Sequence, residues 1–327
     1  MSEQLEHIRN NYRHIVDRAS IIKKIREFFW SQNFIEVETP NILALPGQEP
    51  YLSPMKLVIH NERGEKKNAY LHTSPEYAMK KMLASGFQNI FSICKCYRNN
   101  ESFGGEHNPE FTMLEWYRVG VDFNSIMDDV EMLFNYISDE KIEFERLHMR
   151  DLWDRYVGIN LDNYLDKDKM FPLCVEKGFL PSMEESFEDL FYRIFLNLIE
   201  PNLKGYKIIH HYPAQMAALS KFTDDGYAER FEVYINGLEI ANAFSELTDA
   251  GEQRKRLEEE RKLRIKMKKD VYDIDLDFIE AVGKLPKCAG IALGVDRLVQ
   301  VLLGCKNIDD VLVLPLSITL SPNHLIT

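Results

Sequence analysis

HNPEFTMLEWY, at residues 107–117, ends in a strand pattern that carries polar side chains. Another strand pattern precedes it at residues 89–97, and the loop between them, 98–109, is rich in Asn, Gly and charge. Because successive residues of a strand face opposite ways, Glu115 and Tyr117 share one face. The loop adds four polar side chains, Arg98, Glu101, His107 and Glu110. Such a group is costly unless it is solvated or used, so this long hairpin is either a wet surface feature or a functional loop.

A second polar cluster lies on two later strand patterns, FEVY at residues 231–234 and LEIANAFSE at residues 238–246. Its members are Glu232, Glu239, Asn242 and Glu246. Repeated carboxylates in one place suggest that the ligand is a divalent cation or an ammonium group. Magnesium prefers one or two carboxylates together with phosphate oxygens and water, so an acidic wall opposite a phosphate-binding arginine would suit a nucleotide.

A glycine-punctuated strand, GIALG at residues 290–294, leads into a helix that is expected to begin near Asp296. Glycines let the backbone approach a ligand closely, and Arg297 stands at the start of the helix. The unsatisfied N–H groups and the dipole of a helix N-terminus favour anions. The segment therefore predicts a phosphate site.

Three other segments carry local signals. Residues 45–68 are rich in Pro and Gly and predict surface loops. Ser74 and Pro75 predict a helix start, with Ser74 as the N-cap and Pro75 as the first helical residue. Residues 252–270 mix both signs of charge at i,i+4 spacing, which predicts a solvated helix with surface ion pairs.

The long hairpin, the acidic strand patterns at residues 231–246 and the glycine-punctuated strand with its helix follow one another along the chain. In this order they resemble the signature motifs of class II aminoacyl-tRNA synthetases of the lysine, aspartate and asparagine branch. Motif 1 is matched over about residues 12–40, where an amphipathic helix, a short strand and Pro40 follow one another. Motif 2 is matched over about residues 89–118 and motif 3 over about residues 289–303. The resemblance covers about residues 8–318.

This resemblance implies an α+β fold, with a class II synthetase-like antiparallel sheet flanked by helices. It implies one catalytic domain over residues 1–327, with a helical insertion at about 124–204, where the apolar spacing turns helical. Motif 1 forms the dimer contact in this family, so a homodimer is expected. No room remains before motif 1 for the N-terminal OB fold that reads the anticodon in lysyl-tRNA synthetases.

Within the branch, the lysine enzymes are the most similar, through AERFE at residues 228–232 and EIANAFSEL at residues 239–247. The similarity implies catalytic roles for Arg98 at the α-phosphate and Arg297 at the γ-phosphate of ATP. It implies that ATP is bound by Arg98, Asn100, Glu101, His107, Phe111, Glu239 and Arg297. It implies that a lysine-like substrate is bound by Ser74, Glu76, Glu115, Tyr117, Asn242, Glu246 and Ala292. Magnesium would be held by Glu232 and Glu239.

These roles suit the chemistry of amino-acid activation. In-line attack of a carboxylate on the α-phosphorus needs charge neutralisation and positioning more than a protein nucleophile. Several buried acids would also select an amino acid with two ammonium groups. One departure lies in the motif 2 loop, which reads Arg98-Asn99-Asn100-Glu101 in place of Arg-Asn-Glu-Glu and is one residue longer, so Glu101 is expected to take the adenine-facing role.

Ala292 stands where the tRNA enzymes usually carry glycine. Together with the missing anticodon module, it resembles the truncated paralogues that attach β-lysine to elongation factor P. A methyl group in a close-packed pocket shifts substrate preference by about 1–3 kcal/mol. The resemblance therefore implies ATP-dependent activation of lysine or (R)-β-lysine as an adenylate, with transfer to a lysine side chain of elongation factor P.

Three other functions stay open. A ligase acting on the acceptor stem of tRNA is disfavoured by the net charge of −12, from 40 Lys and Arg against 52 Asp and Glu. An asparagine synthetase on the same fold is disfavoured because Glu76, Glu115 and Glu246 suit a diamine better than aspartate. A silent regulatory paralogue that only binds an amino acid would not need the phosphate-binding Arg98 and Arg297.

Membrane association and disulfides are not expected. The chain contains no run of about 18 apolar residues and no signal peptide, which predicts a cytoplasmic protein. Its five cysteines are scattered apart from Cys94 and Cys96. Their i,i+2 spacing places both thiols on one face of a strand, where they are expected to pack in the core. A metal site would need further Cys or His ligands, and the spacing along the sequence supplies none.

Overall fold

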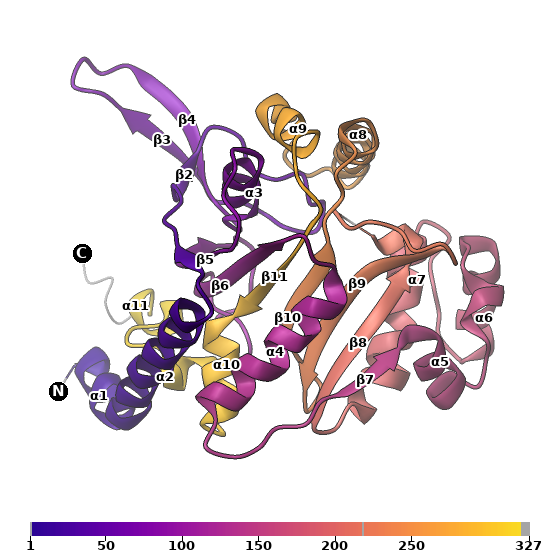
Figure 1. The fold of residues 1–327 in the computed structure, drawn as a ribbon, viewed down its shortest axis with the longest axis horizontal. Helices are drawn as coiled ribbons and strands as arrows, with labels where there is room; N and C mark the ends of the chain where they lie inside the picture. The colour runs from indigo at the N-terminus through magenta and orange to yellow at the C-terminus, as the bar shows by residue number, and fades with distance from the viewer. Residues whose placement is uncertain (1, 218, 322–327) are drawn as a thin grey trace.

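An eight-stranded sheet forms the centre of the computed structural model, which describes residues 2–217 and 219–321 (Figure 1). From one edge to the other, the strands are β1 (Ile35–Glu36), β5 (Ile90–Tyr97), β6 (Glu110–Val119), β11 (Cys288–Gly294), β10 (Leu238–Ser245), β9 (Tyr227–Ile235), β8 (Tyr206–Pro213) and β7 (Glu145–His148). Neighbours are antiparallel except at the edges, where β1 runs parallel to β5 and β7 parallel to β8. The predicted α+β architecture, a mainly antiparallel sheet flanked by helices, is confirmed.

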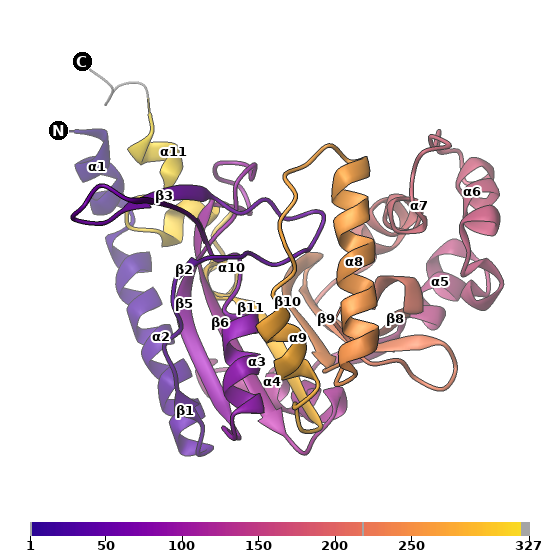
Figure 2. The same cartoon turned by 90° about the horizontal axis from the view of Figure 1, so that it is seen from above.

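Helices cover both faces of this sheet (Figures 1 and 2). One face holds α2 (Tyr12–Ser31), α4 (Phe123–Ile137) and α10 (Val295–Leu302), and the other holds α3 (Glu76–Ala84), α8 (Ala250–Lys266) and α9 (Leu276–Val282). The register of β5 and β6 pairs Phe91 with Trp116 and Ile90 with Tyr117. Because side chains alternate along a strand, the first pair joins the core under α2 and α4, and the second pair faces α3 and α9.

A second hydrophobic core lies beside β8 and β9, within the segment at about 124–204 that the sequence predicts as a helical insertion. Trp153, Phe191 and Phe195 are fully buried there. Its helices and helical turns are α5 (Met149–Val157), η1 (Leu161–Tyr164), α6 (Lys167–Glu176), α7 (Phe187–Ile194), η2 (Phe195–Ile199) and η3 (Glu200–Asn202). The segment is not wholly helical, because it contains β7. The sequence did not predict this strand, since four residues are too few to show an alternating pattern. Its first helix, α4, packs in the central core instead.

Part of the predicted surface loop at residues 45–68 is a β-hairpin. β3 (Lys56–His60) pairs with β4 (Lys66–Leu71), and β2 (Ile42–Leu43) adds a third strand. The prolines of this segment all precede β3, and Gly64 lies in the turn with a φ of +78°. Pro and Gly therefore mark the ends of these strands, which is where both residues are tolerated.

α3 begins one residue later than the sequence predicts. Pro75 occupies the N-cap position, and Glu76 is the first helical residue. Ser74 nevertheless accepts a hydrogen bond from the backbone N–H of Glu76 at 3.0 Å, which satisfies one donor of the first turn.

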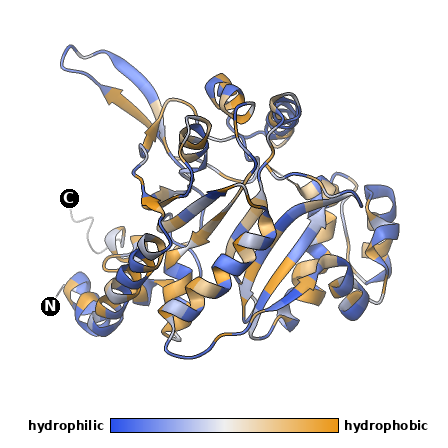
Figure 3. Cartoon of the chain, in the orientation of Figure 1, coloured by the Kyte–Doolittle hydropathy of each residue, from blue (hydrophilic) through white to orange (hydrophobic). Residues whose placement is uncertain are grey.

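α8 is not wholly solvated, although it is drawn mostly in the hydrophilic colour in Figure 3. Three of its side chains are buried, those of Gln253, Leu257 and Arg264. The guanidinium of Arg264 donates to the backbone carbonyls of Glu49 at 2.7 Å and Leu52 at 3.0 Å. These contacts tie α8 to the loop that precedes β3, and i,i+4 charge spacing alone could not predict them.

Short elements complete the fold: α1 (Glu3–Asn10), η4 (Ala214–Met216), η5 (Ile308–Val311) and α11 (Leu316–Thr319). Among residues 2–217 and 219–321, no helix has the length and apolar character needed to cross a membrane.

Candidate functional site

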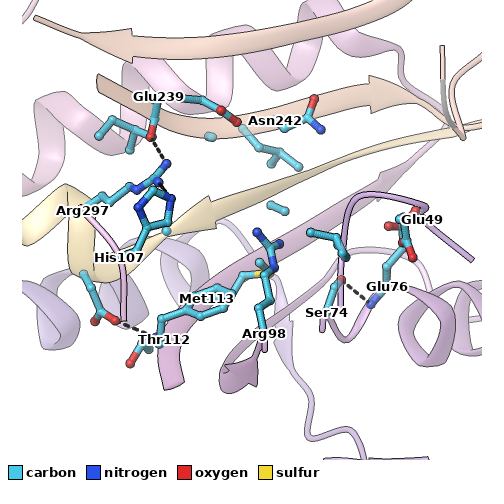
Figure 4. Close-up of a pocket in the computed structure, with 18 of the residues that line it drawn as sticks. Glu49, Ser74, Glu76, Arg98, His107, Thr112, Met113, Glu239, Asn242 and Arg297 are labelled. Carbon is cyan, nitrogen blue, oxygen red and sulfur yellow. Dashed lines mark hydrogen bonds between the residues drawn. The ribbon is translucent and has the colours of Figure 1, made fainter. Parts of the chain in front are cut away.

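A cavity of about 320 Å³ is lined by residues of β6, β11 and β10, which are neighbours in the sheet. Figure 4 shows how its side chains are distributed: Arg297 and His107 lie at one end, Ser74 and Glu76 at the other, and Arg98 lies between them. Glu76 begins α3 and Arg297 lies in the first turn of α10, whereas His107 comes from the loop between β5 and β6. The cavity therefore has one cationic end and one acidic end.

Arg297 is fixed at the cationic end by three contacts. It lies in the first turn of α10 and donates to the backbone carbonyls of Glu239 at 2.8 Å and Glu106 at 3.1 Å. Its Nη2 lies 2.8 Å from Nε2 of His107. Burial and the nearby charge of Arg297 lower the pKa of His107, so the neutral imidazole can accept this hydrogen bond.

Arg98 follows β5 and lies over an aromatic ring. The central carbon of its guanidinium is 5.0 Å from the centre of the Phe111 ring, a cation–π contact. Its Nε is buried, and among the residues that the structure describes none accepts a hydrogen bond from it. Because buried donors are normally paired, this N–H group suits an oxygen atom of a ligand.

At the acidic end, one lysine faces two carboxylates. Glu76 lines the cavity, and the ammonium of Lys80 behind it lies 2.5 Å from Oε1 of Glu76 and 2.5 Å from Oε2 of Glu246. Lys80 and Glu246 are only 1% and 3% exposed. When both carboxylates are charged, the three groups carry a net negative charge, which an ammonium group of a ligand would neutralise.

A third carboxylate, Glu115, is buried behind Ser74 and Tyr117. Both hydroxyls donate to it, that of Tyr117 at 3.1 Å. Burial raises the pKa of Glu115, and the nearby charge of Glu76 raises it further. Burial also raises the pKa of Glu246, against the opposing effect of Lys80. A cation in the cavity would favour the charged form of these carboxylates.

The wall formed by β9 and β10 carries two more carboxylates. Glu239 lines the cavity, and burial together with the charge of Glu232 raises its pKa to about 7. Glu232 lies behind the wall, where it accepts hydrogen bonds from Arg230 at 2.6 Å, from Tyr212 at 2.5 Å and from Tyr234 at 2.8 Å. Glu239 is thus the carboxylate that a ligand in the cavity would meet first.

Comparison with known proteins shows the family to which the chain belongs. The sequence model of the family described as tRNA synthetases class II (D, K and N) matches residues 4–317. The elongation factor P–(R)-β-lysine ligase of Avibacterium paragallinarum is 38% identical over 310 residues, which cover 91% of this chain and 94% of that protein. That of Sodalis glossinidius is 38% identical over 306 residues, 91% and 93% of the two chains. An elongation factor P–(R)-β-lysine ligase homolog of Aquifex aeolicus is 40% identical over 286 residues, 86% and 93% of the two chains.

The chain belongs to the elongation factor P–(R)-β-lysine ligase family. The resemblance inferred from the three motifs is thereby confirmed, as is the class II synthetase fold. Members of this family are class II synthetase-like ligases, and such a ligase uses ATP.

Most of the site residues expected from the sequence line the cavity of this ligase-family chain. They are Ser74, Glu76, Arg98, Glu101, His107, Phe111, Tyr117, Glu239, Asn242, Ala292 and Arg297. Glu115, Glu232 and Glu246 do not line it and lie behind its walls. Asn100 does not line it either. Its φ is +64°, and its exposed side chain donates to the Ser53 hydroxyl at 3.3 Å.

Several residues of the site escaped the sequence analysis. Lys80 could have been found, because it lies one helical turn after Glu76. Glu49 lines the cavity from an irregular loop that has no periodic signal. Gly290 packs so closely that a Cβ there would come within 2.3 Å of the Tyr117 ring, so only glycine fits. That contact depends on the pairing of β6 with β11 and cannot be seen in one strand alone.

Proposed function

We propose that this chain activates (R)-β-lysine with ATP and transfers it to a lysine side chain of elongation factor P. The relatives named above carry this reaction in their names. The observation that carries the proposal is the polarity of the cavity, which has Arg297 at one end, Arg98 in the middle and the buried acids around Glu76 at the other end. A nucleotide and an amino acid with two ammonium groups match these two ends.

In the first step, a carboxylate oxygen of the amino acid attacks the α-phosphorus of ATP, and the bond to the bridging oxygen of pyrophosphate breaks. The protein supplies no nucleophile for this step. The unpaired Nε of Arg98 suits a phosphate oxygen, and its stacking on Phe111 fixes the direction in which it points. Arg297 is held by two carbonyls and His107, which fix the position of its charge for the triphosphate.

In the second step, the amine of an acceptor lysine attacks the carbonyl carbon of the adenylate. An amide bond forms, AMP leaves with the electron pair of the broken C–O bond, and the attacking amine loses a proton. The acceptor must reach the cavity from outside, and the acids around Glu76 hold the activated amino acid in place meanwhile.

The acidic end selects the amino acid. One substrate ammonium would complete the charge balance of Glu76, Lys80 and Glu246, and the hydroxyl-bonded Glu115 offers a second anionic partner. Ala292 lines the same cavity and is paired with Asn242 across β10 and β11. Its methyl group reduces the space beside Asn242, which suits a substrate whose amine and carboxylate are spaced differently from those of α-lysine.

The acidic wall fits Mg²⁺. Among the described residues, none donates a hydrogen bond to the carboxylate of Glu239, and burial together with the charge of Glu232 raises its pKa more than the nearby arginines lower it. Glu239 would hold the ion directly, with Glu232 as a second carboxylate behind it. Bound Mg²⁺ would neutralise phosphate charge, while Arg230, Tyr212 and Tyr234 keep Glu232 oriented.

The proposal is tested in two stages with purified protein. Exchange of labelled pyrophosphate into ATP should depend on an added amino acid, and (R)-β-lysine should give a higher kcat/KM than α-lysine. Incubation with elongation factor P should then raise the mass of that protein by one lysine residue. If pyrophosphate exchange occurs but the amino acid is transferred to tRNA and not to elongation factor P, the proposed acceptor is wrong. If no exchange occurs, the whole proposal is wrong.

A further inference from the structure

We propose that His72, Cys94 and Cys96 form a binding site for a thiophilic metal ion, Zn²⁺ or Cu⁺. Their three donor atoms, one imidazole nitrogen and two sulfurs, all lie within 4.8 Å of one another. The two sulfurs are 4.0 Å apart, and Sγ of Cys96 lies 3.9 Å from Nε2 of His72. In the part of the chain that the structure describes, this is the one group of three such side chains that meets these limits.

The spacing of the donors matches that of a metal centre. With bonds of about 2.3 Å to sulfur and about 2.0 Å to nitrogen, a three-coordinate ion keeps two sulfurs about 4 Å apart and a sulfur and nitrogen slightly closer. The observed distances of 4.0 and 3.9 Å are close to these values. The thioether sulfur of Met113 lies 4.0 Å from Sγ of Cys96 and offers a further soft donor. Thiolate and imidazole donors favour Zn²⁺ and Cu⁺ over Mg²⁺.

The site is built into the fold and not spread over the surface. His72 and Cys96 are 1% and 0% exposed, and Cys94 is half-buried, which leaves one side through which an ion could enter. Nε2 of His72 now lies 2.5 Å from the carbonyl oxygen of Lys95. To bind the ion, this nitrogen must release that contact and carry no proton, and the thiols must lose theirs. Binding is therefore expected to weaken as the pH falls.

The ligands join two segments of the proposed active site. Cys94 and Cys96 lie on β5, and Cys96 stands two residues before Arg98. His72 stands two residues before Ser74. A bound ion would tie the turn that carries Ser74 to the strand that leads to Arg98. Because the three ligands come together only in the folded chain, the ion would bind the folded chain in preference to the unfolded chain and so stabilise it. This site is distinct from the acidic wall at Glu239, whose oxygen ligands suit Mg²⁺.

The test uses full-length protein that has been reduced and freed of metal with a chelator. Zn²⁺ is titrated against a chromophoric chelator and Cu⁺ against a colorimetric Cu⁺ ligand without oxygen, and the two titrations decide between the cations. We expect about one tightly bound ion per chain, a rise in Tm on binding, and binding at least about tenfold weaker in Cys94→Ser, Cys96→Ser and His72→Gln. Co²⁺ should give a sulfur-to-metal charge-transfer band in the wild type and none in the double cysteine variant.

Cys305→Ser is the matched control. Sγ of Cys305 lies 3.7 Å from Nδ1 of His14, which makes a thiol–imidazole pair that lacks a second thiol. This variant should bind metal like the wild type. A measurement on wild-type protein alone guards against variants that misfold: Zn²⁺ or Cu⁺ should protect Cys94 from alkylation, read by mass spectrometry. Equal binding in the wild type and the double cysteine variant, or alkylation of Cys94 that neither metal slows, would overturn the proposal.

Discussion

The buried ammonium of Lys80 lies 2.5 Å from the Oε2 carboxylate oxygen of Glu246, while Oε1 of Glu246 has no hydrogen-bond donor among the described residues. Lys80→Met would leave Glu246 and Glu76 without a cation. Breaking a buried ion pair by removing one partner destabilises a protein by about 3–5 kcal/mol. We expect a loss of this size in urea unfolding at about pH 9, where Glu246 is charged, and a smaller loss at neutral pH and below, because burial raises the pKa of Glu246 to about 8 and a protonated carboxyl needs no cation.

The control for this variant is Lys284→Met. Lys284 and Glu280 form an i,i+4 pair with the same 2.5 Å separation, but both side chains are more than 60% exposed. Exposed pairs contribute about 0–1 kcal/mol, so this variant should unfold almost like the wild type. Equal losses in the two variants would show that burial of Lys80 is not what gives the pair its effect.

Arg297→Ala and Glu239→Gln should each abolish adenylate formation while the fold stays intact. Each removes charge compensation for the triphosphate, and loss of one preorganised electrostatic contact typically lowers rates by about 100- to 1000-fold. Pyrophosphate exchange measures the loss, and circular dichroism checks the fold. Arg254→Ala, which removes an exposed arginine paired with Glu258 on α8, should leave exchange unchanged. Wild-type exchange in Arg297→Ala would mean that the nucleotide binds elsewhere.

Ala292→Gly should relax the choice between lysine isomers. Removing the methyl group opens space beside Asn242, and one such group is worth about 1–3 kcal/mol of discrimination. The ratio of kcat/KM for α-lysine to that for (R)-β-lysine should rise in the variant, since this ratio reports differential binding of the transition states. An unchanged ratio would show that Ala292 does not discriminate between the two lysine isomers.

A homodimer is expected, because α2 and the strands after it expose apolar side chains. Tyr12 is 68% exposed and Trp30 52%, and Ile35 and Ile42 continue the exposed apolar surface. Sedimentation at micromolar concentration should give about twice the chain mass of 38.3 kDa. Trp30→Glu should shift the mass toward one chain, whereas Leu180→Glu, at a 93% exposed position between α6 and α7, should not. A wild-type mass of one chain would contradict the expectation.

The histidines of β7 and β8 should make stability depend on pH. Burial and a neighbouring histidine lower the pKa of His148 to about 4 and that of His210 to about 3. Both values lie below the value of about 6.5 in an unfolded chain, so the unfolded state binds more protons as the pH falls from about 6.5 to about 4, and stability falls with it. Urea unfolding across this range should show a shallower fall in His148→Gln/His210→Gln. His60→Gln, at an exposed position of β3, should follow the wild type.

The sequence predicted best those features that one segment determines. The alternation of β5 and β6 and the helical spacing of α2 follow from residues next to one another. Motif 2, the acidic strand pattern at residues 238–246 and motif 3 supply Arg98, Glu239 and Arg297, which line one cavity. Contacts between distant segments could not be predicted in this way. His72 meets Cys96 only because the turn after β4 folds onto β5, and Arg264 reaches the loop before β3 across more than two hundred residues. The β3–β4 hairpin was not predicted. Pro and Gly are typical of loops, and the sequence alone does not show whether they lie inside a long loop or at the ends of strands.

The bonds from Arg264 to the carbonyls of Glu49 and Leu52 have a consequence for how substrates enter. Glu49 and Leu52 both line the cavity, so a helix that lies outside it holds part of its lining in place. Moving the loop away from the cavity would break both hydrogen bonds to Arg264, so we expect the loop and α8 to move together. A lining that is held in place in this way loses less conformational entropy when the amino acid binds. Affinity for the amino acid should therefore depend on residues of α8 that never touch it.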